Sequence, residues 1–360
     1  MREVSIKDIA KIHYGKALKK DERVESGNVN VFGSNGIVGK HDEFLFQEPT
    51  VIIGRKGSVG KTIYTEEKSW TIDTAFYSEI DKEKVDIKYF YYALTAKDME
   101  QYAITTSIPG INRNDIYDLK IPLPTLSEQK AIVAKLDRAQ RLIDIDREML
   151  AKYDELIQSV FLEMFGDPVR NPMDLDTIKL GDYCDVVRGS SPRPKGDPRY
   201  FDGPVPRLMV EDVTRDGMFV TPQIDSLTEE GAKKSRWMKT GDVVVAASGR
   251  PGIPTILQVD CCIHDGFIGL RNLSREINPK FLYYFFFNIA KDMGLRSDGA
   301  IFKNITTTNV KNLEIYKVPI DLQMKFAQKA DLIRKEIEKI ETSRKKSEEL
   351  FSSLVQGVFG

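Results

Sequence analysis

The sequence predicts a mixed α/β protein built from two similar modules, each followed by one long helix. The first observation is an internal repeat: residues 4–15 return 174 positions later as residues 178–189, and residues 51–53 return 192 positions later as residues 243–245. The second observation is a pair of long amphipathic stretches at an offset of 194, one after each copy. Such a period is far too long for a solenoid. The growing offset instead predicts two copies of one fold, the second with an insertion of about 20 residues.

Four segments follow from this plan. The first module is expected to contain strands at residues 51–53 and 72–80, with Gly-rich turns between them, and its main helix at residues 86–99. The second module repeats these elements. The predicted segments are a first module at residues 1–124, a long helix at 125–166, a second module at 167–318 and a second long helix at 319–360.

In both long stretches apolar residues recur at steps of three and four, which is typical of an amphipathic helix. The first begins after Pro122 and Pro124 with Ser127 as an N-cap. We expect the two stripes to pack on each other, antiparallel about a pseudo-twofold axis, which pairs Asp146 with Arg344. The predicted helix-pair interface comprises Ile132, Leu136, Ala139, Ile143, Asp146, Leu150, Ile157, Phe326, Ile333, Ile337, Ile340, Arg344, Phe351 and Leu354.

Composition argues against a protein that binds any polyanion through its overall charge. The chain has 53 Lys and Arg residues against 54 Asp and Glu residues, a net charge of -1. Specific DNA binding stays possible because charge can be segregated on one face or in loops. The first residues do not resemble a secretory signal, and no stretch approaches a membrane span, so we expect a cytoplasmic protein without membrane contact.

Two motifs that suggest chemistry do not meet its requirements. Residues 54–62 resemble a phosphate-binding loop, but Arg55 stands where the first glycine of that motif belongs, and β-branched residues follow. Cys261 and Cys262 are adjacent on a predicted strand and therefore point to opposite faces, which disfavours one shared metal ion. Motifs of an amino-methyltransferase or a nuclease are also missing from the sequence. We therefore predict a recognition protein with no catalysis, metal or cofactor of its own.

Several motifs resemble the specificity subunit of type I restriction–modification systems. The most specific is Ile-Pro-Leu-Pro-Thr-Leu-Ser-Glu-Gln-Lys at residues 121–130, which opens the first long helix; residues 109–116, 32–40 and 51–60 also resemble that family. The resemblance covers the whole chain in its order of modules and helices. Residues 316–323 lack the first proline and the glutamate, so the second helix is expected to start differently in detail.

This resemblance implies that each module is a target recognition domain for one half of a split double-stranded DNA sequence. The helices would act as a spacer and dock two methyltransferase subunits, which methylate adenine with S-adenosylmethionine; a restriction and translocase subunit would consume ATP. The apolar stripe that the two helices share, about 33 residues long, spans about 50 Å at 1.5 Å per residue, which predicts an unread gap of fixed length. Two alternatives remain: the specificity partner of a type IIB restriction enzyme, and a helical scaffold whose modules bind protein.

The candidate DNA contacts are polar and basic residues of the Gly-rich loops. Arg and Asn can bind guanine and adenine through two hydrogen bonds, while Lys more often contacts phosphate. Matching loops in the two modules carry such residues, and each set is expected to read one half-site. They are Asn35, Arg55, Lys56, Ser58, Lys61, Asn112 and Arg113 in the first module, and Arg188, Ser190, Ser191, Arg193, Lys195, Arg207, Arg250, Lys303 and Asn304 in the second.

Overall fold

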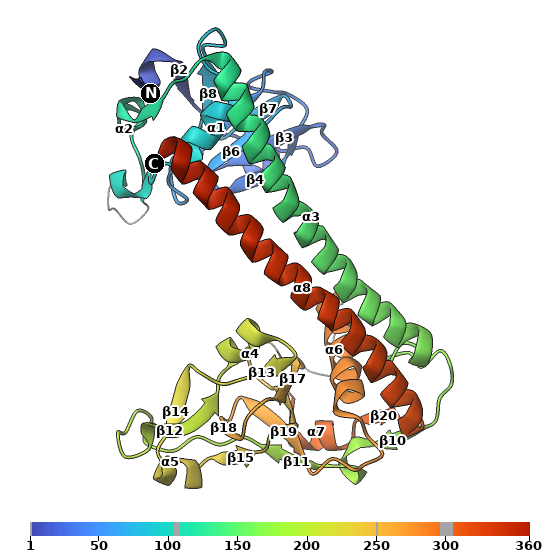
Figure 1. Ribbon diagram of the computed structural model, residues 1–360. Helices are drawn as coiled ribbons and strands as arrows, with labels where there is room; N and C mark the ends of the chain where they lie inside the picture. Colours follow the sequence, from blue (N-terminus) through green and yellow to red (C-terminus); the bar gives the residue numbers. More distant parts are fainter. Residues whose placement is uncertain (1, 104–108, 250, 296–304) are drawn as a thin grey trace. The chain divides into compact units, whose positions relative to one another are not determined.

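The computed structural model describes residues 2–103, 109–249, 251–295 and 305–360 (Figure 1). The chain divides into two compact units, each of which combines one module with one half of each long helix. The first unit comprises Met1–Glu148 and Ile340–Gly360, and the second comprises Met149–Lys339. The mixed α/β fold class predicted from the sequence is confirmed.

The first module contains a four-stranded sheet in the order β2-β8-β5-β6, a three-stranded sheet β4-β3-β7 and the pair β1-β9. Its strands are β1 Glu3–Ser5, β2 Ala10–Tyr14, β3 Val29–Gly33, β4 Gly36–His41, β5 Thr50–Gly54, β6 Thr62–Thr65, β7 Ser69–Thr71, β8 Ala75–Ile80 and β9 Lys120–Pro122. Its helices are η1 Ile6–Asp8, η2 Lys20–Glu22, α1 Ile87–Thr95, η3 Glu100–Tyr102 and α2 Arg113–Asp118.

Strand β5 is buried over its whole length, and its centre, residues 51–53, is apolar because both faces of the strand are covered. Val51 and Ile53 belong to the core that includes α1, whereas Ile52 packs with Phe32 and Ala75 in a smaller cluster. The Asp86 side chain caps α1 by accepting hydrogen bonds from two backbone N–H groups of its first turn. Three aromatic residues of α1, Tyr89, Phe90 and Tyr92, are buried in the core of the first module, so they are core residues and not base-stacking platforms.

The second module repeats this plan with additions. Its sheets run β11-β19-β16-β17-β13 and β14-β12-β18-β15, with the pair β10-β20. The strands are β10 Thr177–Lys179, β11 Asp185–Arg188, β12 Phe201–Leu208, β13 Phe219–Val220, β14 Asp225–Leu227, β15 Arg236–Met238, β16 Val243–Ala246, β17 Pro254–Leu257, β18 Cys261–Ile263, β19 Phe267–Arg271 and β20 Glu314–Tyr316. The helices are η4 Leu180–Asp182, α4 Val210–Asp216, α5 Glu229–Lys233, α6 Pro279–Leu295 and α7 Thr307–Lys311. Elements α4, β13 and α5 lie in the interval where the offset of the repeat grows.

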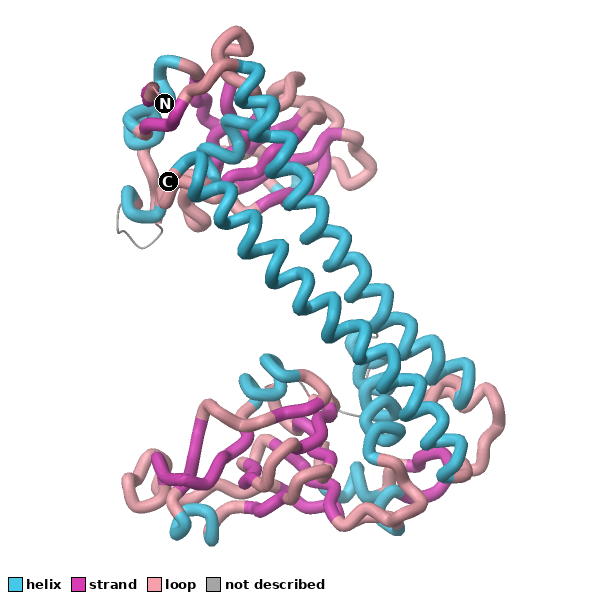
Figure 2. Tube along the Cα trace, viewed as in Figure 1, coloured by secondary structure: helices cyan, strands magenta, loops and turns pink. Residues whose placement is uncertain are grey.

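The two long helices are α3 Leu126–Phe165 and α8 Ile320–Phe359, and they are antiparallel (Figure 2). In the first unit, Leu136 near the start of α3 shares a core with Phe359 at the end of α8. In the second unit, Phe165 at the end of α3 packs on Phe326 near the start of α8, with ring centroids 5.6 Å apart. Of the predicted interface positions, those that are buried are Leu136, Ala139, Ile143, Ile157, Phe326 and Ile340.

One predicted contact of the helix pair is wrong. Arg344 does not bind Asp146; its Nη1 donates to Glu348 one turn further along α8, at 2.7 Å. Within the described part of the chain, Oδ2 of Asp146 is buried without a hydrogen-bond partner, and the ion pair across the seam joins Arg147 to Glu348 at 3.6 Å. The neighbour four residues along the same helix therefore competes successfully for the arginine.

A buried glutamine fastens the start of each long helix to its module. Oε1 of Gln129 accepts from the N–H of Asp86 at 2.8 Å, and Nε2 donates to the carbonyls of Lys84 and Pro124, both at 2.9 Å. Gln323 makes the same three bonds in the second module, with Asn278, Glu276 and Val318.

The caps of the two long helices differ, as the sequence predicts. The N-cap of the first long helix is Thr125 and not Ser127 as predicted, because the helix already begins at Leu126. Oε2 of Glu128 accepts from the N–H of Thr125 at 2.8 Å, and the N–H of Glu128 donates to the hydroxyl of Thr125 at 3.4 Å, which forms a capping box. The equivalent residues of the second helix are Leu322 and Pro319, and they cannot form that box.

Candidate nucleic-acid interface

The loop between β5 and β6 is held in a tight conformation by glycines. Gly57 and Gly60 have φ values of +80° and +72°, and a Cβ on Gly60 would lie 2.4 Å from Cβ of Met99. Strand β6 follows the loop, so no helix N-terminus is present there to bind a phosphate. This agrees with the sequence-based rejection of a phosphate-binding loop.

This loop brings most candidate residues of the first module together. Backbone hydrogen bonds join it to residues 109–111. The N–H of Gly57 donates to the carbonyl of Pro109 at 3.0 Å, and the N–H of Ile111 donates to the backbone carbonyl of Arg55 at 3.0 Å. Arg55 and Lys56 therefore lie beside Asn112 and Arg113. These four predicted residues, separated by more than fifty positions in sequence, form one cluster.

Two further candidates lie at the other end of the same loop. Nζ of Lys61 donates to the carbonyl of Asn35 at 3.0 Å and to its Oδ1 at 2.7 Å. This exposed pair ties the loop to the β3–β4 hairpin. Ser58, between the two groups, is half-buried.

Tyr14 organises the arginines of the cluster, and sequence analysis missed it. The guanidinium carbons of Arg55 and Arg113 lie 4.9 Å and 5.2 Å from the centre of the Tyr14 ring. Nη1 of Arg55 also donates to the carbonyl of Asp73 at 3.0 Å. Among the described residues, neither guanidinium forms an ion pair with a carboxylate. Two adjacent cations without a counter-ion attract an anionic ligand.

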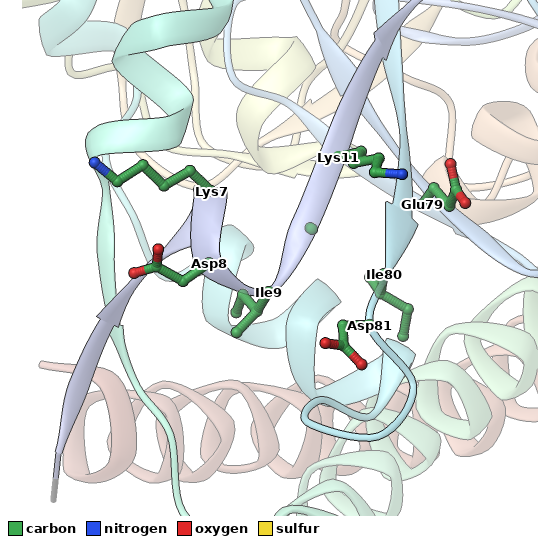
Figure 3. A pocket seen from close by; sticks show the side chains of 8 residues that line it. Lys7, Asp8, Ile9, Lys11, Glu79, Ile80 and Asp81 are labelled. Carbon is green, nitrogen blue, oxygen red and sulfur yellow. The ribbon is translucent and has the colours of Figure 1, made fainter.

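A separate hollow at the other end of β8 lacks this character (Figure 3). It encloses about 330 Å³, and both basic and acidic side chains line it, among them Lys11, Glu79 and Asp81. Glu79 binds His13 at 3.0 Å and Asp81 binds Lys84 at 2.8 Å. Its charges are therefore largely compensated, which does not favour a polyanion.

In the second module, the corresponding cluster is centred on Asp265. Nε of Arg188 donates to the Asp265 carbonyl at 2.7 Å, and Nη1 donates to the carbonyl of Ile305 at 3.1 Å. The Asp265 carboxylate accepts from the hydroxyl of Ser191 at 2.8 Å and lies 3.5 Å from Nη2 of Arg193. The hydrogen bond from Ser191 is the main cause that lowers the pKa of Asp265. At neutral pH this aspartate is thus charged and orients both side chains.

The neighbouring His264 is neutral at that pH. Burial lowers its pKa, and its Nδ1 accepts a hydrogen bond from the N–H of Gly266 at 2.9 Å. It shapes the turn before β19.

The prediction that Arg207 contacts DNA is contradicted by its position. Arg207 lies on β12, is 4% exposed and forms an ion pair with Asp225. Its guanidinium carbon lies 4.9 Å from the centre of the Phe201 ring. Because the carboxylate of Asp225 already binds the charge of the guanidinium and the ring of Phe201 covers its planar face, this arginine stabilises the second module and does not reach DNA.

The remaining candidates of the second module differ in their surroundings. The hydroxyl of Ser190 donates to the carbonyl of Lys234 at 3.3 Å, and Lys195 is exposed. Arg250, Lys303 and Asn304 lie outside the described residues.

Metal binding and membrane insertion find no support in the described residues. Over residues 2–103, 109–249, 251–295 and 305–360, no three His, Cys, Asp or Glu side chains form a group that could hold a metal ion. Cys261 and Cys262 are buried on β18 with free thiols. None of the helices described here has a stretch long and apolar enough to cross a membrane.

Comparison with known proteins gives a consistent result. The family described as the type I restriction modification DNA specificity domain matches residues 1–152 and 172–350. A protein of Methanocaldococcus jannaschii described as the type I restriction enzyme MjaX specificity subunit is 24% identical over 292 residues, 74% of this chain and 67% of that protein. The MjaVIII specificity subunit of the same organism is 23% identical over 342 residues, 84% of this chain and 78% of that protein.

Solved structures share the fold. The S subunit of a type I restriction–modification system from M. genitalium aligns with a TM-score of 0.61 and 17% identity, covering 100% of this chain and 96% of that one. With the family match spanning most of both modules and both long helices, this chain belongs to the type I restriction modification DNA specificity domain family.

Proposed function

We propose that this chain is the non-catalytic specificity subunit of a type I restriction–modification enzyme and reads a split sequence in double-stranded DNA. The observation that carries the proposal is that arginines from separate segments gather in one cluster in each module, in a chain of this family. The first cluster comprises Tyr14, Arg55, Lys56, Asn112 and Arg113; the second comprises Arg188, Ser191, Arg193 and Asp265.

The residue types suit DNA. An arginine fixed by a carbonyl or an aromatic ring loses little further entropy on binding, and it can reach a base edge or a phosphate oxygen. Each module would serve one half-site, since each carries its own cluster.

The test is the affinity of the assembled methyltransferase complex for a library of DNA targets. We expect Arg113→Ala to affect one half-site and Arg193→Ala the other, each by about 1–3 kcal/mol if a base contact is lost. Loss of a phosphate contact would weaken binding evenly and reduce its salt dependence.

Matched controls remove equal charge at the far end of the same sheets. Lys82 follows β8 and Arg275 follows β19, whereas the clusters lie before these strands, so their alanine variants should bind as the wild type does. If both cluster variants relaxed the same half-site, or neither changed affinity or sequence preference, the proposal would be wrong.

We further propose that α3 docks a methyltransferase subunit. Leu142, Ile145, Met149 and Leu156 recur on one face of α3 and are 37–49% exposed, which is unusual for four large apolar residues in one stripe. Each residue of this face is next in sequence to a position of the buried stripe. Because successive residues of an α-helix are rotated by about 100° about its axis, the exposed face lies about 100° from the buried one. One of the solved structures with the same fold, at a TM-score of 0.59 and 18% identity, comes from a study of complex assembly of the type I restriction–modification system.

Assembly provides the measurement. Ile145→Asp should abolish co-purification with the methyltransferase subunits, while Glu148→Ala, on the same helix but outside the stripe, should leave it intact. Unchanged assembly of the Ile145→Asp protein would refute this docking surface.

A further inference from the structure

Both modules hold one arginine against the same backbone carbonyl, but they supply it from different positions. In the first module Nη1 of Arg55 donates to the carbonyl of Asp73 at 3.0 Å. In the second module Nε of Arg188 donates to the carbonyl of Asp265 at 2.7 Å.

Asp73 and Asp265 occupy equivalent places, as the surrounding hydrogen bonds demonstrate. The N–H of Gly15 donates to the carbonyl of Ala75 at 3.1 Å, and the N–H of Gly189 donates to the carbonyl of Phe267 at 3.0 Å. Each acceptor lies two residues after the aspartate.

The next residues continue the match. The N–H of Lys16 donates to Thr71 at 2.9 Å, and the N–H of Ser190 donates to Ile263 at 3.1 Å. Here each acceptor lies two residues before the aspartate. The two turns therefore superpose residue by residue.

The two arginines are not equivalent in sequence. Tyr14 pairs with Phe76 across the sheet and Arg188 pairs with Ile268, so the counterpart of Arg188 is Tyr14.

The counterpart of Arg55 is Ala247. The backbone N–H of Arg55 donates to the carbonyl of Thr74 at 2.9 Å, and the backbone N–H of Ala247 donates to the carbonyl of Gly266 at 2.8 Å. An alignment of the two modules thus pairs one arginine with a tyrosine and the other with an alanine.

We propose that Arg55 and Arg188 are functional counterparts, each contributing the same DNA-contacting guanidinium to its half-site, Arg55 from the loop after β5 and Arg188 from the end of β11. This inference rests on the proposed function. In both modules the carbonyl takes one edge of the guanidinium and fixes its position. In Arg55 the hydrogen bonds of the described residues use only Nη1, which leaves Nε and Nη2 for acceptors on DNA, either a base edge or a phosphate.

Moving the arginine within one module tests the inference. Arg55→Ala should weaken binding of the assembled complex to its DNA target about 5- to 150-fold, which corresponds to 1–3 kcal/mol. The double variant Tyr14→Arg with Arg55→Ala places the arginine where the second module has it, and it should recover most of that loss. Tyr14→Ala with Arg55→Ala is the matched control and should not recover.

The reciprocal exchange gives an independent arm. Arg188→Tyr should weaken binding, and adding Ala247→Arg should restore it. A loss confined to one base pair identifies a base contact, and an even loss with reduced salt dependence identifies a phosphate contact; both outcomes support the inference.

Two different failures can be told apart. If the single variants weaken binding but neither double variant recovers it, while circular dichroism shows native folding, the equivalence of Arg55 and Arg188 is wrong. If neither single variant changes DNA binding, the proposed assignment of these loops to DNA is wrong as well.

Discussion

Removing the side-chain amide of Gln129 should destabilise the first unit strongly, although this residue has no role in DNA contact. Gln129 is fully buried and binds three backbone groups that belong to the loop before α1 and to the segment before α3. Methionine has a similar shape but can satisfy none of these groups. At about 1 kcal/mol for each hydrogen bond, Gln129→Met should cost about 3 kcal/mol.

Hydrogen–deuterium exchange measured by mass spectrometry can locate this loss. A cost of about 3 kcal/mol corresponds to roughly 150-fold faster exchange of amides that open with the unit. We expect it in peptides of the first module for Gln129→Met, and in peptides of the second module for Gln323→Met. Gln140→Met is the control, because Gln140 makes one hydrogen bond, at 3.0 Å to Asp144 four residues along the same helix.

If Gln129→Met exchanged no faster than Gln140→Met, the buried amide would not hold the helix to the module. A uniform increase over both modules would show that the loss is not local.

Other properties follow from single contacts. Arg207→Ala should lower the free energy of unfolding by about 3 kcal/mol and leave sequence preference unchanged, because it strands the partly buried Asp225; a changed DNA preference with normal stability would contradict this. Cys184, Cys261 and Cys262 should resist a thiol reagent at pH 8 until the protein is unfolded, since burial raises their pKa values to about 12, 12 and 11 and keeps them protonated; fast labelling of the native protein would refute it. Deleting seven residues from both long helices should shift the gap of the DNA target while preserving each half-site, and an unchanged gap would refute the helices as a spacer.

Much of the fold could be predicted because it depends on periodicity. The helical stripes, the internal repeat and the prolines before residue 126 define both long helices to within two residues of their observed ends. The insertion in the second module follows from the drift of the offset alone.

Side-chain partners could not be predicted in the same way. Arg207 has the composition of a DNA contact, and only the fold reveals that Asp225 faces it. Symmetric matching of the helices pairs Asp146 with Arg344, but it ignores the competition from Glu348 on the same helix. Tyr14 was missed because a tyrosine at a strand end carries no sign of the two arginines that meet on its ring.

The last turn of α8 completes the core of the first module, and this has a consequence for synthesis. Phe359 is 4% exposed and packs on Tyr89 at 5.2 Å between ring centroids, whereas the second unit is one continuous stretch, Met149–Lys339. On the ribosome the second unit can therefore mature before the first, the reverse of the usual order. A product truncated before Ile340 would leave the apolar surface around Tyr89 uncovered, a state that proteases and chaperones recognise.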